Sequence, residues 1–483
     1  MGDRWSSAWG FTLAALLLGA AIQLNFGTLS NGGILLLTLA LVACIFAVIG
    51  PKWDAIREQN VTFALRVAIG IQVGLLLIWP PGAATALQDS ATLLPFRIAI
   101  AAAGILGLST VVFPARAGWR ITAVIAIYVL AGAWVVALSP NPPNDVWYVH
   151  QTAGHALLAG KDPYAIQMPN IYGPGSGYYA PSLERGAFLD FGFPYPPLSL
   201  LLALPGIVVG DVRYALLIAS AMSAAIVARI RPGPLATGAA LLLLFTPRTF
   251  FIVEQSWTEP FIVMLLALTV LLASRASRVT PVGLGLLLAL KQHLVLTLPL
   301  ALLMAPRPIA SRRLVLPTGV AVAVFLVVTL PFAIWNMSAF WHSVVEVQFL
   351  QPSRPDALAY PAWFGMPQVA AIAGFVALVP ALALVIWRSA RTPAGYAGAV
   401  ALVYLAFFAF NKQAFANYYY MVVGALCIAV AATRIEPWVT GMTAVDTGQL
   451  EMNEATERRL DRSNAVLAMS LPIKTNANNS VGA

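Results

Sequence analysis

Uncharged apolar runs recur along almost the whole chain of 483 residues, and they constrain its fold more than any other feature. Each run is long enough to cross about 30 Å of hydrocarbon as an α-helix, which satisfies its backbone hydrogen bonds internally. The runs lie at residues 8–25, 33–50, 63–80, 93–113, 120–138, 196–210, 212–228, 234–252, 258–274, 314–334, 366–387, 394–410 and 414–432. The sequence therefore predicts an all-α polytopic membrane protein of about 13 spans.

The composition excludes a soluble fold and several kinds of site. Hydrophobic residues make up 60% of the chain and charged residues 10%, whereas roughly a quarter of an ordinary soluble domain is charged. Cys44 and Cys427 both fall within predicted spans, so neither a disulfide framework nor a cysteine-based zinc site is expected. The formal net charge is +9, but the basic residues are scattered in short loops. That distribution is typical of membrane topology and not of nucleic-acid binding.

One apolar stretch, residues 280 to 305, differs from the others because polar residues interrupt its middle. Lys291, Gln292 and His293 stand there together. Charges at such depth are costly unless they are paired or functional. We therefore expect two short helices around a polar tip.

The distribution of Lys and Arg predicts which side of the membrane each connection faces, because cytoplasmic loops carry the excess of these residues. The basic clusters are Lys52 with Arg57, Arg116 with Arg120, Arg275 with Arg278, Arg307 with Arg312 and Arg313, Arg388 with Arg391, and Arg434. Both termini are therefore predicted to be cytoplasmic and residues 139–193 extracytoplasmic. Three full spans between residues 194 and 252 would break this pattern at Arg229 and Arg231, so one segment there is expected to be short or re-entrant.

These features divide the chain into four parts. Residues 1–138 form five N-terminal spans, residues 139–193 an outer loop, residues 194–434 a helical core, and residues 435–483 a flexible cytoplasmic tail of mixed charge. An inverted-repeat transporter is expected to show its repeat in the hydropathy pattern. We find no such internal repeat in this sequence.

The outer loop carries a polar helix followed by a long irregular stretch. Asn144 is suited to the N-cap of that helix and Gly160 to its end, which gives about four turns. One face of the helix then carries four polar residues, Asp145, Tyr148, Thr152 and His155. Such a face could line a cleft, or lie in water as part of an interfacial helix. The Gly-, Pro- and Tyr-rich stretch that follows is long for a connection, which favours a functional loop.

Three features of this region together resemble a known family: Asp145 shortly after a span, the stretch HALLAGKDPYA, and PYPPL at the start of the next span. They are similar to the GT-C class of integral membrane glycosyltransferases, and within it to glycosyltransferase family 87, which includes polyprenyl-phosphomannose-dependent mannosyltransferases. The resemblance covers roughly residues 139–432. This chain departs from the family in having five spans before the aspartate where the family pattern implies one.

The resemblance implies a GT-C-type helical bundle with an extracytoplasmic cleft. There a sugar, by default mannose, passes with inversion from a polyprenyl-phosphate donor to a glycolipid or polysaccharide acceptor. Asp145 matches the general base, which takes the proton of the acceptor hydroxyl. No cofactor is expected, and membrane lipid is the remaining expected partner. Catalysis without a metal ion is predicted because no acid lies within two residues of Asp145, although Asp162 or Asp190 could supply a second ligand through folding.

A lipid phosphate that leaves the sugar needs cationic or hydrogen-bond stabilisation. The candidates for that role are Lys291, His293, Lys412 and Arg248. Lys412 is equally consistent with a side chain that extends to the membrane interface. The candidates for sugar or acceptor contacts are Tyr148, His155, Tyr195, Glu254, Gln255 and Gln413, although the acids near residue 254 could instead cap helices. Residues 335–363 add aromatic, amide and charged side chains, among them Gln351, Arg354 and Asp356, and are expected to cover the donor or acceptor.

Two functions of other classes stay open at this point. Lys291 and His293 within an apolar stretch would also suit the path of a lipid-linked or anionic substrate through a transporter or flippase. A non-catalytic scaffold for cell-wall assembly is the second alternative. Loss of sugar transfer in an Asp145→Asn protein would favour the enzyme over both.

Overall fold

A computed structural model describes residues 4–50, 56–113, 117–305 and 312–434. These residues form a helical bundle, and the only sheet among them consists of three strands of two residues each. The predicted tail, residues 435–483, lies outside the described residues, as do Lys52, Arg116 and Arg307 of the predicted basic clusters.

Among the described residues, eight helices are long and apolar enough to cross a membrane, and the chain is accordingly a multi-pass membrane protein. They are α1 (Trp5–Gln23) with the turn that follows it, α2 (Asn31–Ile49), α3 (Glu58–Ile78), α4 (Leu94–Val112), α5 (Ala117–Leu138), α8 (Val212–Ile230), α14 (Arg312–Trp335) and α18 (Ala370–Arg388). Shorter apolar helices are α7 (Pro197–Val208), α9 (Pro234–Leu244), α11 (Glu259–Ser274), α19 (Pro393–Ala409) and α20 (Ala416–Ala432).

The remaining elements are short and lie between these helices. On the outer loop they are α6 (Asp145–Leu158), β1 (Met168–Pro169), η4 (Pro181–Leu183), β2 (Glu184–Arg185) and β3 (Phe188–Leu189). Elsewhere they are η1 (Leu24–Gly27), η2 (Thr85–Gln88), α10 (Thr249–Glu254), α12 (Thr280–Leu288), η5 (Gln292–Leu296), α13 (Thr297–Leu300), η6 (Ala301–Met304), α15 (Met337–Trp341), the π-helix η7 (His342–Glu346), α16 (Val347–Leu350), α17 (Tyr360–Trp363) and η8 (Pro367–Val369). The strands are antiparallel in the order β1-β3-β2, with Leu189 paired to both Met168 and Glu184.

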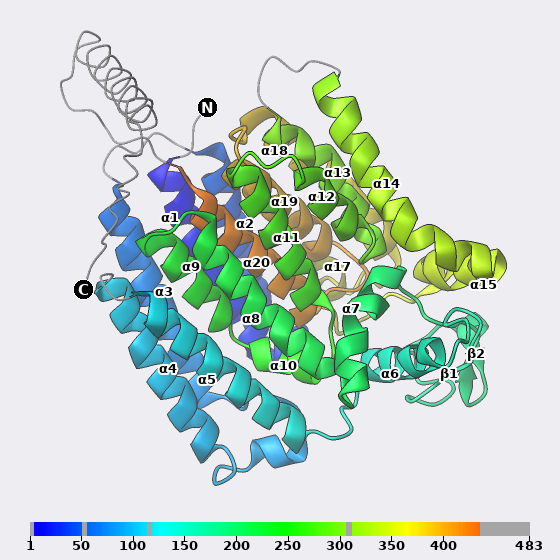
Figure 1. The fold of residues 1–483 in the computed structure, drawn as a ribbon. Coiled ribbons are helices and arrows are strands. Elements are labelled where there is room, and N and C mark those ends of the chain that lie inside the picture. The colour runs from blue at the N-terminus through cyan, green and yellow to red at the C-terminus, as the bar shows by residue number, and fades with distance from the viewer. Residues whose placement is uncertain (1–3, 51–55, 114–116, 306–311, 435–483) are drawn as a thin grey trace, which may run out of the picture. The chain divides into compact units, whose positions relative to one another are not determined.

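Helix α20 lies in the middle of the bundle and is buried along its whole length. It packs against α1, α9, α11 and α19, and α2 and α3 pack against α1 (Figure 1). A helix that is apolar on all sides has to be enclosed by others or by lipid, and α20 is enclosed by protein. Helix α14 is the opposite case, because only 11% of its spanning window is buried and its main contact is α12.

Two apolar segments are interrupted, one of them against the prediction and the other as predicted. The segment 234–252 divides into α9 and α10, because Pro247 disfavours helical backbone at Thr246 and Arg248 adopts a φ of 65°. The segment 280–305 has the predicted form, with α12 ending at Leu288 and short helical turns resuming at Gln292. Lys291 stands at the tip between them.

Helix α7 is too short to cross a bilayer. Its 12 residues are about 18 Å long, against about 30 Å of hydrocarbon. Both of its ends adjoin α6, because the His150 ring stacks on Tyr195 just before α7 (centroids 5.6 Å apart) and Gln151 Nε2 donates to the carbonyl of Gly210 just after it (3.1 Å). The prediction that one segment between residues 194 and 252 is short is confirmed.

Candidate functional site

Asp145 occupies the first position of α6, and the local sequence sets the start of this helix. The Asn144 side chain accepts a hydrogen bond from the backbone N–H of Val146 (2.8 Å) and caps the helix. Beyond the other end, Gly160 adopts a φ of 71°, a left-handed conformation that glycine tolerates best. The predicted cap and end of this helix are confirmed, and Asp145 is therefore carried on a defined turn of backbone.

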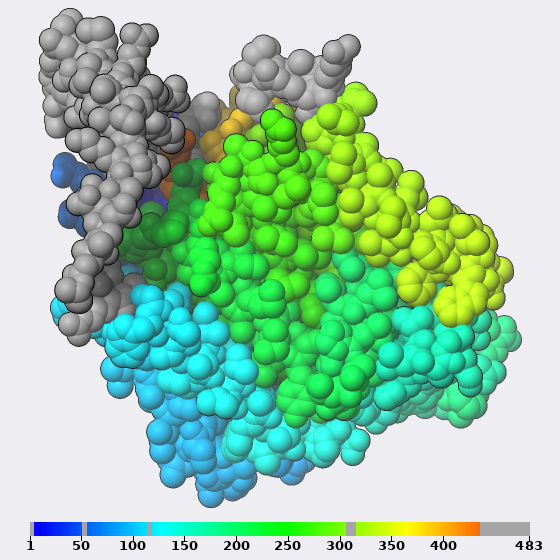
Figure 2. All heavy atoms as spheres, in the orientation of Figure 1, coloured from blue at the N-terminus to red at the C-terminus, as the bar shows by residue number. Residues whose placement is uncertain are grey.

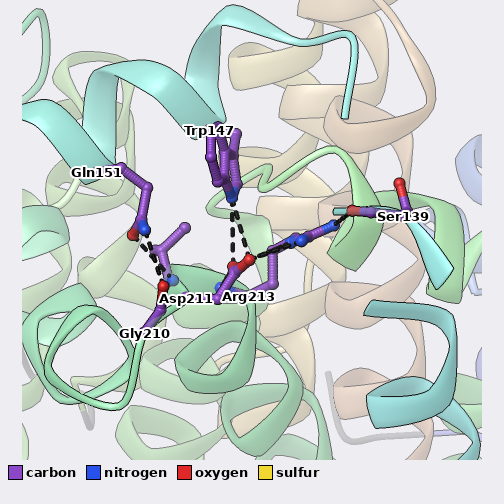
Figure 3. Close-up of polar contacts among 7 residues, drawn as sticks. Ser139, Trp147, Gln151, Gly210, Asp211 and Arg213 are labelled. Carbon is purple, nitrogen blue, oxygen red and sulfur yellow. Dashed lines mark hydrogen bonds and ion pairs between the residues drawn. The ribbon is translucent and has the colours of Figure 1, made fainter. Parts of the chain in front are cut away.

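A set of contacts fixes α6 to the start of α8 (Figure 3). Trp147 Nε1 donates to both carboxylate oxygens of Asp211 (3.3 Å each). The Gln151 side chain forms hydrogen bonds with the backbone of the two residues that flank Asp211. Arg213 forms a fork with the same carboxylate (2.9 and 2.6 Å) and donates to the carbonyl of Ser139 (2.6 Å). Since Ser139 follows α5, these contacts join α5, α6 and α8 next to Asp145.

Two tyrosines from the irregular part of the outer loop bind the Asp145 carboxylate. The Tyr179 hydroxyl donates to Oδ2 (2.5 Å), and the Tyr172 hydroxyl donates to Oδ1 (3.3 Å). Tyr172 also accepts the backbone N–H of Asp145 (3.2 Å). The stretch that is rich in Gly, Pro and Tyr thus folds back over the start of α6 and orients its acid.

Burial changes the acidity of this group and of its partners. It raises the pKa of Asp145, and the hydrogen bonds from Tyr179 and Tyr172 offset only part of that rise. Burial and the nearby Asp145 charge raise the pKa of Tyr179, so its hydroxyl stays protonated and donates. Asp145 is therefore a stronger base than an ordinary aspartate, and two hydroxyls hold its orientation.

A cavity of about 320 Å³ adjoins Asp145. Its walls come from the start of α6, the outer-loop tyrosines, η1, the region after α10, Lys291, residues 348–356 and residues 413–418. Aromatic rings make up much of the lining, and its charged side chains are Asp145, Lys291, Arg354 and Asp356. Apolar walls with a few convergent polar groups are typical of small-molecule sites.

Lys291 reaches this cavity from the tip between α12 and η5. Its Nζ donates to Glu259 Oε1 (2.6 Å), and Asn417 Nδ2 donates to the same oxygen (3.0 Å). The ammonium also lies 5.3 Å from the ring centroid of Tyr195 and 5.7 Å from that of Tyr418. The partner that a charge at this depth requires is therefore Glu259.

Arg354 forms a second ion pair on the cavity wall, with Asp356 two residues along the chain. The two residues share two hydrogen bonds, of 2.9 and 2.7 Å. The guanidinium carbon lies 4.1 Å from the ring centroid of Tyr178, and Tyr178 stacks on Tyr172 at 4.0 Å. A continuous stack thus leads from Arg354 to the tyrosine that binds Asp145.

The segment from α15 to α16, within residues 335–363, packs against the outer loop. Figure 2 shows the yellow-green residues of this region against the green-teal residues of the outer loop. Ser343 Oγ accepts the N–H of Gly192 (3.0 Å), and His342 Nε2 lies 2.8 Å from the carbonyl of Asp190. These contacts close one side of the loop that carries the tyrosines.

The N-terminal helices complete the cavity through η1. Phe26 and Thr28 of this turn and its flank line the cavity, and Arg248 holds them in place. The Arg248 guanidinium donates to the carbonyls of Pro80 (3.1 Å) and Gln23 (3.0 Å) and lies 3.9 Å from the Phe26 ring centroid. Arg248 therefore supports the wall of the cavity, and it is not among the residues that line it.

Of the predicted site residues, the structure brings four to this cavity, Asp145, Tyr195, Lys291 and Gln413. Of the predicted polar face of α6, Asp145 alone lines the cavity, and the other α6 residues that line it are Val146 and Val149. Tyr148 packs edge-on against Trp147 (4.8 Å between centroids), and His155 is exposed. Neither Tyr148 nor His155 therefore lines this cavity, and the exposed His155 agrees with the alternative of a face that lies in water.

Four other candidates also lie away from the cavity. Glu254 accepts the N–H groups of Ala83 (2.7 Å) and Ala84 (2.9 Å) and receives a hydrogen bond from Gln255 (3.2 Å), so this pair anchors the connection after α3. The His293 ring is enclosed by Tyr404, Phe408 and Tyr418. Lys412 Nζ donates to the carbonyls of Gln348 (3.0 Å) and Gln351 (2.7 Å) and stabilises the end of α16.

Sequence reasoning assigned no role to several residues that shape the site. Tyr172 and Tyr179 belong to the Gly-, Pro- and Tyr-rich stretch that the sequence predicts to be a functional loop. Nothing in their spacing indicates which acid they bind. Arg354 and Asp356 were predicted to belong to a covering loop, without their pairing. Asn417 gave no signal, because a single amide at the end of an apolar span is common.

The chain was also compared with models of protein families, with curated proteins and with solved structures, and no match was found. Any functional conclusion therefore depends on the residues and geometry described above.

Proposed function

We propose that this protein is an inverting glycosyltransferase that moves a sugar, by default mannose, from a polyprenyl-phosphate donor to a hydroxyl group of a glycolipid or polysaccharide. In the step, the acceptor hydroxyl oxygen forms a bond to the anomeric carbon and gives its proton to Asp145. The bond from that carbon to the phosphate oxygen breaks, and its electron pair leaves with the polyprenyl phosphate. Atoms and charge balance without a further reactant.

The observation that carries this proposal is the position of Asp145 in the cavity. Its carboxylate is oriented by two tyrosine hydroxyls, and burial raises its pKa toward the range in which a base is effective. The same cavity contains Lys291, whose ammonium carries three N–H donors and gives one of them to Glu259. A base oriented by hydrogen bonds and a cation in one cavity suit proton removal from a hydroxyl beside a departing phosphate.

Lys291 is the donor-phosphate candidate that this geometry supports. The other three candidates of the sequence prediction use their donors elsewhere or lie among aromatic rings. Arg354 also lines the cavity, but its acid partner Asp356 lines it too and would repel a phosphate, whereas Glu259, the partner of Lys291, is not among the lining residues. The phosphate is therefore assigned to the Lys291 part of the cavity.

The proposal places the cavity on the extracytoplasmic side, and the short α7 supports that topology. Because α7 begins and ends beside α6, α8 is the next crossing after α5. Its far end then carries Arg229 and Arg231 to the side of Arg275, whose guanidinium donates to the carbonyl of Arg229 (3.4 Å). Arg229, Arg231 and Arg275 then lie on the same side of the membrane, so the distribution of basic residues agrees with the number of crossings.

The test is sugar transfer by an Asp145→Asn protein in lipid nanodiscs, with labelled polyprenyl-phosphate mannose and a membrane glycolipid extract. We expect transfer to be abolished and donor binding to be retained, because the amide keeps the shape of the acid but takes no proton. Asp190→Asn is the matched control, since Asp190 pairs with Arg185 at the exposed side of the same loop (3.0 Å) and leaves transfer intact. Undiminished transfer by the Asp145→Asn protein would contradict the assignment, and movement of the lipid-linked sugar across vesicles without transfer would favour the transporter.

A further inference from the structure

The cavity contains a second polar wall that the proposed reaction step does not use. We call it the Arg354 wall and define it by Arg354, Asp356, Tyr178, Gln351 and Gln413, all of which line the cavity. The wall is polar but has no net charge, because its one cation and its one acid are paired through two hydrogen bonds. An anion therefore gains little from it.

The paired groups still offer hydrogen bonds in both directions. The fork uses two of the five N–H donors of Arg354, and Asp356 retains lone pairs on its carboxylate. The Gln413 amide donates to the carbonyl of Pro352 (3.1 Å), which leaves its oxygen as an acceptor. A hydroxyl group is both a donor and an acceptor, so neighbouring hydroxyls on a sugar ring match such a mixed set.

The wall is also held rigidly. Tyr178 lies between the guanidinium of Arg354 and the ring of Tyr172, with the two rings inclined by only 15°. The backbone N–H of Arg354 donates to the carbonyl of Lys412 (2.9 Å), and the N–H of Leu29 donates to that of Asp356 (2.9 Å). Groups fixed in this way lose little freedom when a ligand binds.

We infer that the Arg354 wall is the subsite for an uncharged sugar ring of the acceptor, and that this ring presents its reactive hydroxyl to Asp145. The stack supplies the connection, because Tyr178 adjoins Tyr172 and the Tyr172 hydroxyl binds Asp145 (3.3 Å). The assignment of this sugar ring to the acceptor rests on the proposed function. The binding of a neutral sugar at this wall stands independently of it.

The test measures binding of two probes to the purified protein in nanodiscs by ligand-observed NMR titration. One probe is a panel of methyl glycosides of mannose, glucose, galactose and arabinose, and the other is farnesyl phosphate. Arg354→Gln and Asp356→Asn should each weaken binding of the glycoside that the wild type prefers by about tenfold, as expected for loss of hydrogen bonds to a charged group. Both variants should bind farnesyl phosphate as the wild type does. In the transfer assay, Arg354→Gln should raise the acceptor KM more than it lowers kcat.

Arg185→Gln is the matched control, because Arg185 forms an exposed arginine–aspartate pair on the outer loop, outside the cavity, and the variant should leave both probes unaffected. The inference would be overturned if both wall variants bound the preferred glycoside as tightly as the wild type does. It would also be overturned if the wild type bound no glycoside. Weaker farnesyl phosphate binding by Arg354→Gln would also overturn it, since the wall would then be an anion site. A wild type that binds glycosides through this wall but transfers no sugar would refute the proposed function and leave the sugar site in place.

Discussion

Two ion pairs adjoin the cavity in different surroundings, one of which lines it through Lys291 alone and the other through both Arg354 and Asp356. The side chains of Lys291 and Glu259 are 8% and 1% exposed, whereas those of Arg354 and Asp356 are 16% and 45% exposed. The first pair joins residues 32 positions apart in the sequence, and the second joins residues 2 positions apart. The same charge chemistry therefore carries a different energetic weight in the two places.

The difference shows how one site can separate stability from recognition. Breaking a buried pair leaves an uncompensated charge in a medium of low dielectric constant, whereas water screens an exposed one. Removal of one member of the Lys291 pair is therefore expected to destabilise the packed helices. The Arg354 pair contributes little to packing, which leaves its hydrogen-bonding groups available for a ligand.

The largest effect is expected when the buried pair loses its cation. Lys291→Met should lower the free energy of unfolding by about 3–5 kcal/mol, because the buried Glu259 carboxyl loses its ion-pair partner and retains the hydrogen bond from Asn417. Chemical unfolding in mixed detergent micelles, followed by circular dichroism, measures the change.

The double variant Lys291→Met/Glu259→Met tests the reason for that loss. Replacing both charges by apolar side chains should restore stability to within about 1 kcal/mol of the wild type, since well-packed apolar residues often replace buried pairs without cost. If the double variant is as unstable as the single one, packing around Lys291 and not the unpaired carboxylate determines the effect.

The two pairs also differ in how far the sequence could predict them. Lys291 splits an apolar stretch, and that interruption predicts both its depth and its need for a partner. Glu259 could not be identified as that partner, because the pairing depends on how α11 packs beside the tip. Arg354 and Asp356 are ordinary residues of a polar loop, and their position on the cavity wall depends on contacts with Lys412 and Leu29 that no local pattern indicates.

The fold was more predictable than the site for a physical reason. Spanning helices require long apolar runs, and α6 carries its own cap and end signals, so local sequence determines both. The break at Arg248 was missed because Pro247 lies inside an otherwise continuous apolar run. The sequence did not indicate which side chains of α6 face the cavity. The prediction assumed that polar side chains line a cleft, whereas Val146 and Val149 face this aromatic cavity.

A smaller effect is expected at Asp145, which shares the cavity with both pairs. Tyr179→Phe removes the shorter of its two hydroxyl hydrogen bonds and should raise the pKa of Asp145 further, because that bond favours the charged carboxylate. A base must be deprotonated to act, so the acid limb of the transfer rate should move to higher pH. The rate at neutral pH should fall by about tenfold. Tyr172→Phe, which removes a longer bond (3.3 Å), should shift the limb less. Equal shifts, or a shift to lower pH, would contradict this ranking.

The smallest effect on stability is expected at the exposed pair. Arg354→Gln should lower the free energy of unfolding by at most about 1 kcal/mol, because Asp356 stays accessible to water when its partner is removed. The same micelle titration measures it, and added salt should reduce even this loss while leaving that of Lys291→Met almost unchanged, since mobile ions screen exposed charges and not buried ones. A loss as large as that of Lys291→Met would make the Arg354 pair a packing element, and weaker sugar binding by the variant could then reflect a collapsed wall. A small loss of stability combined with a tenfold loss of glycoside affinity has one physical source, the removal of hydrogen bonds that the ligand itself receives.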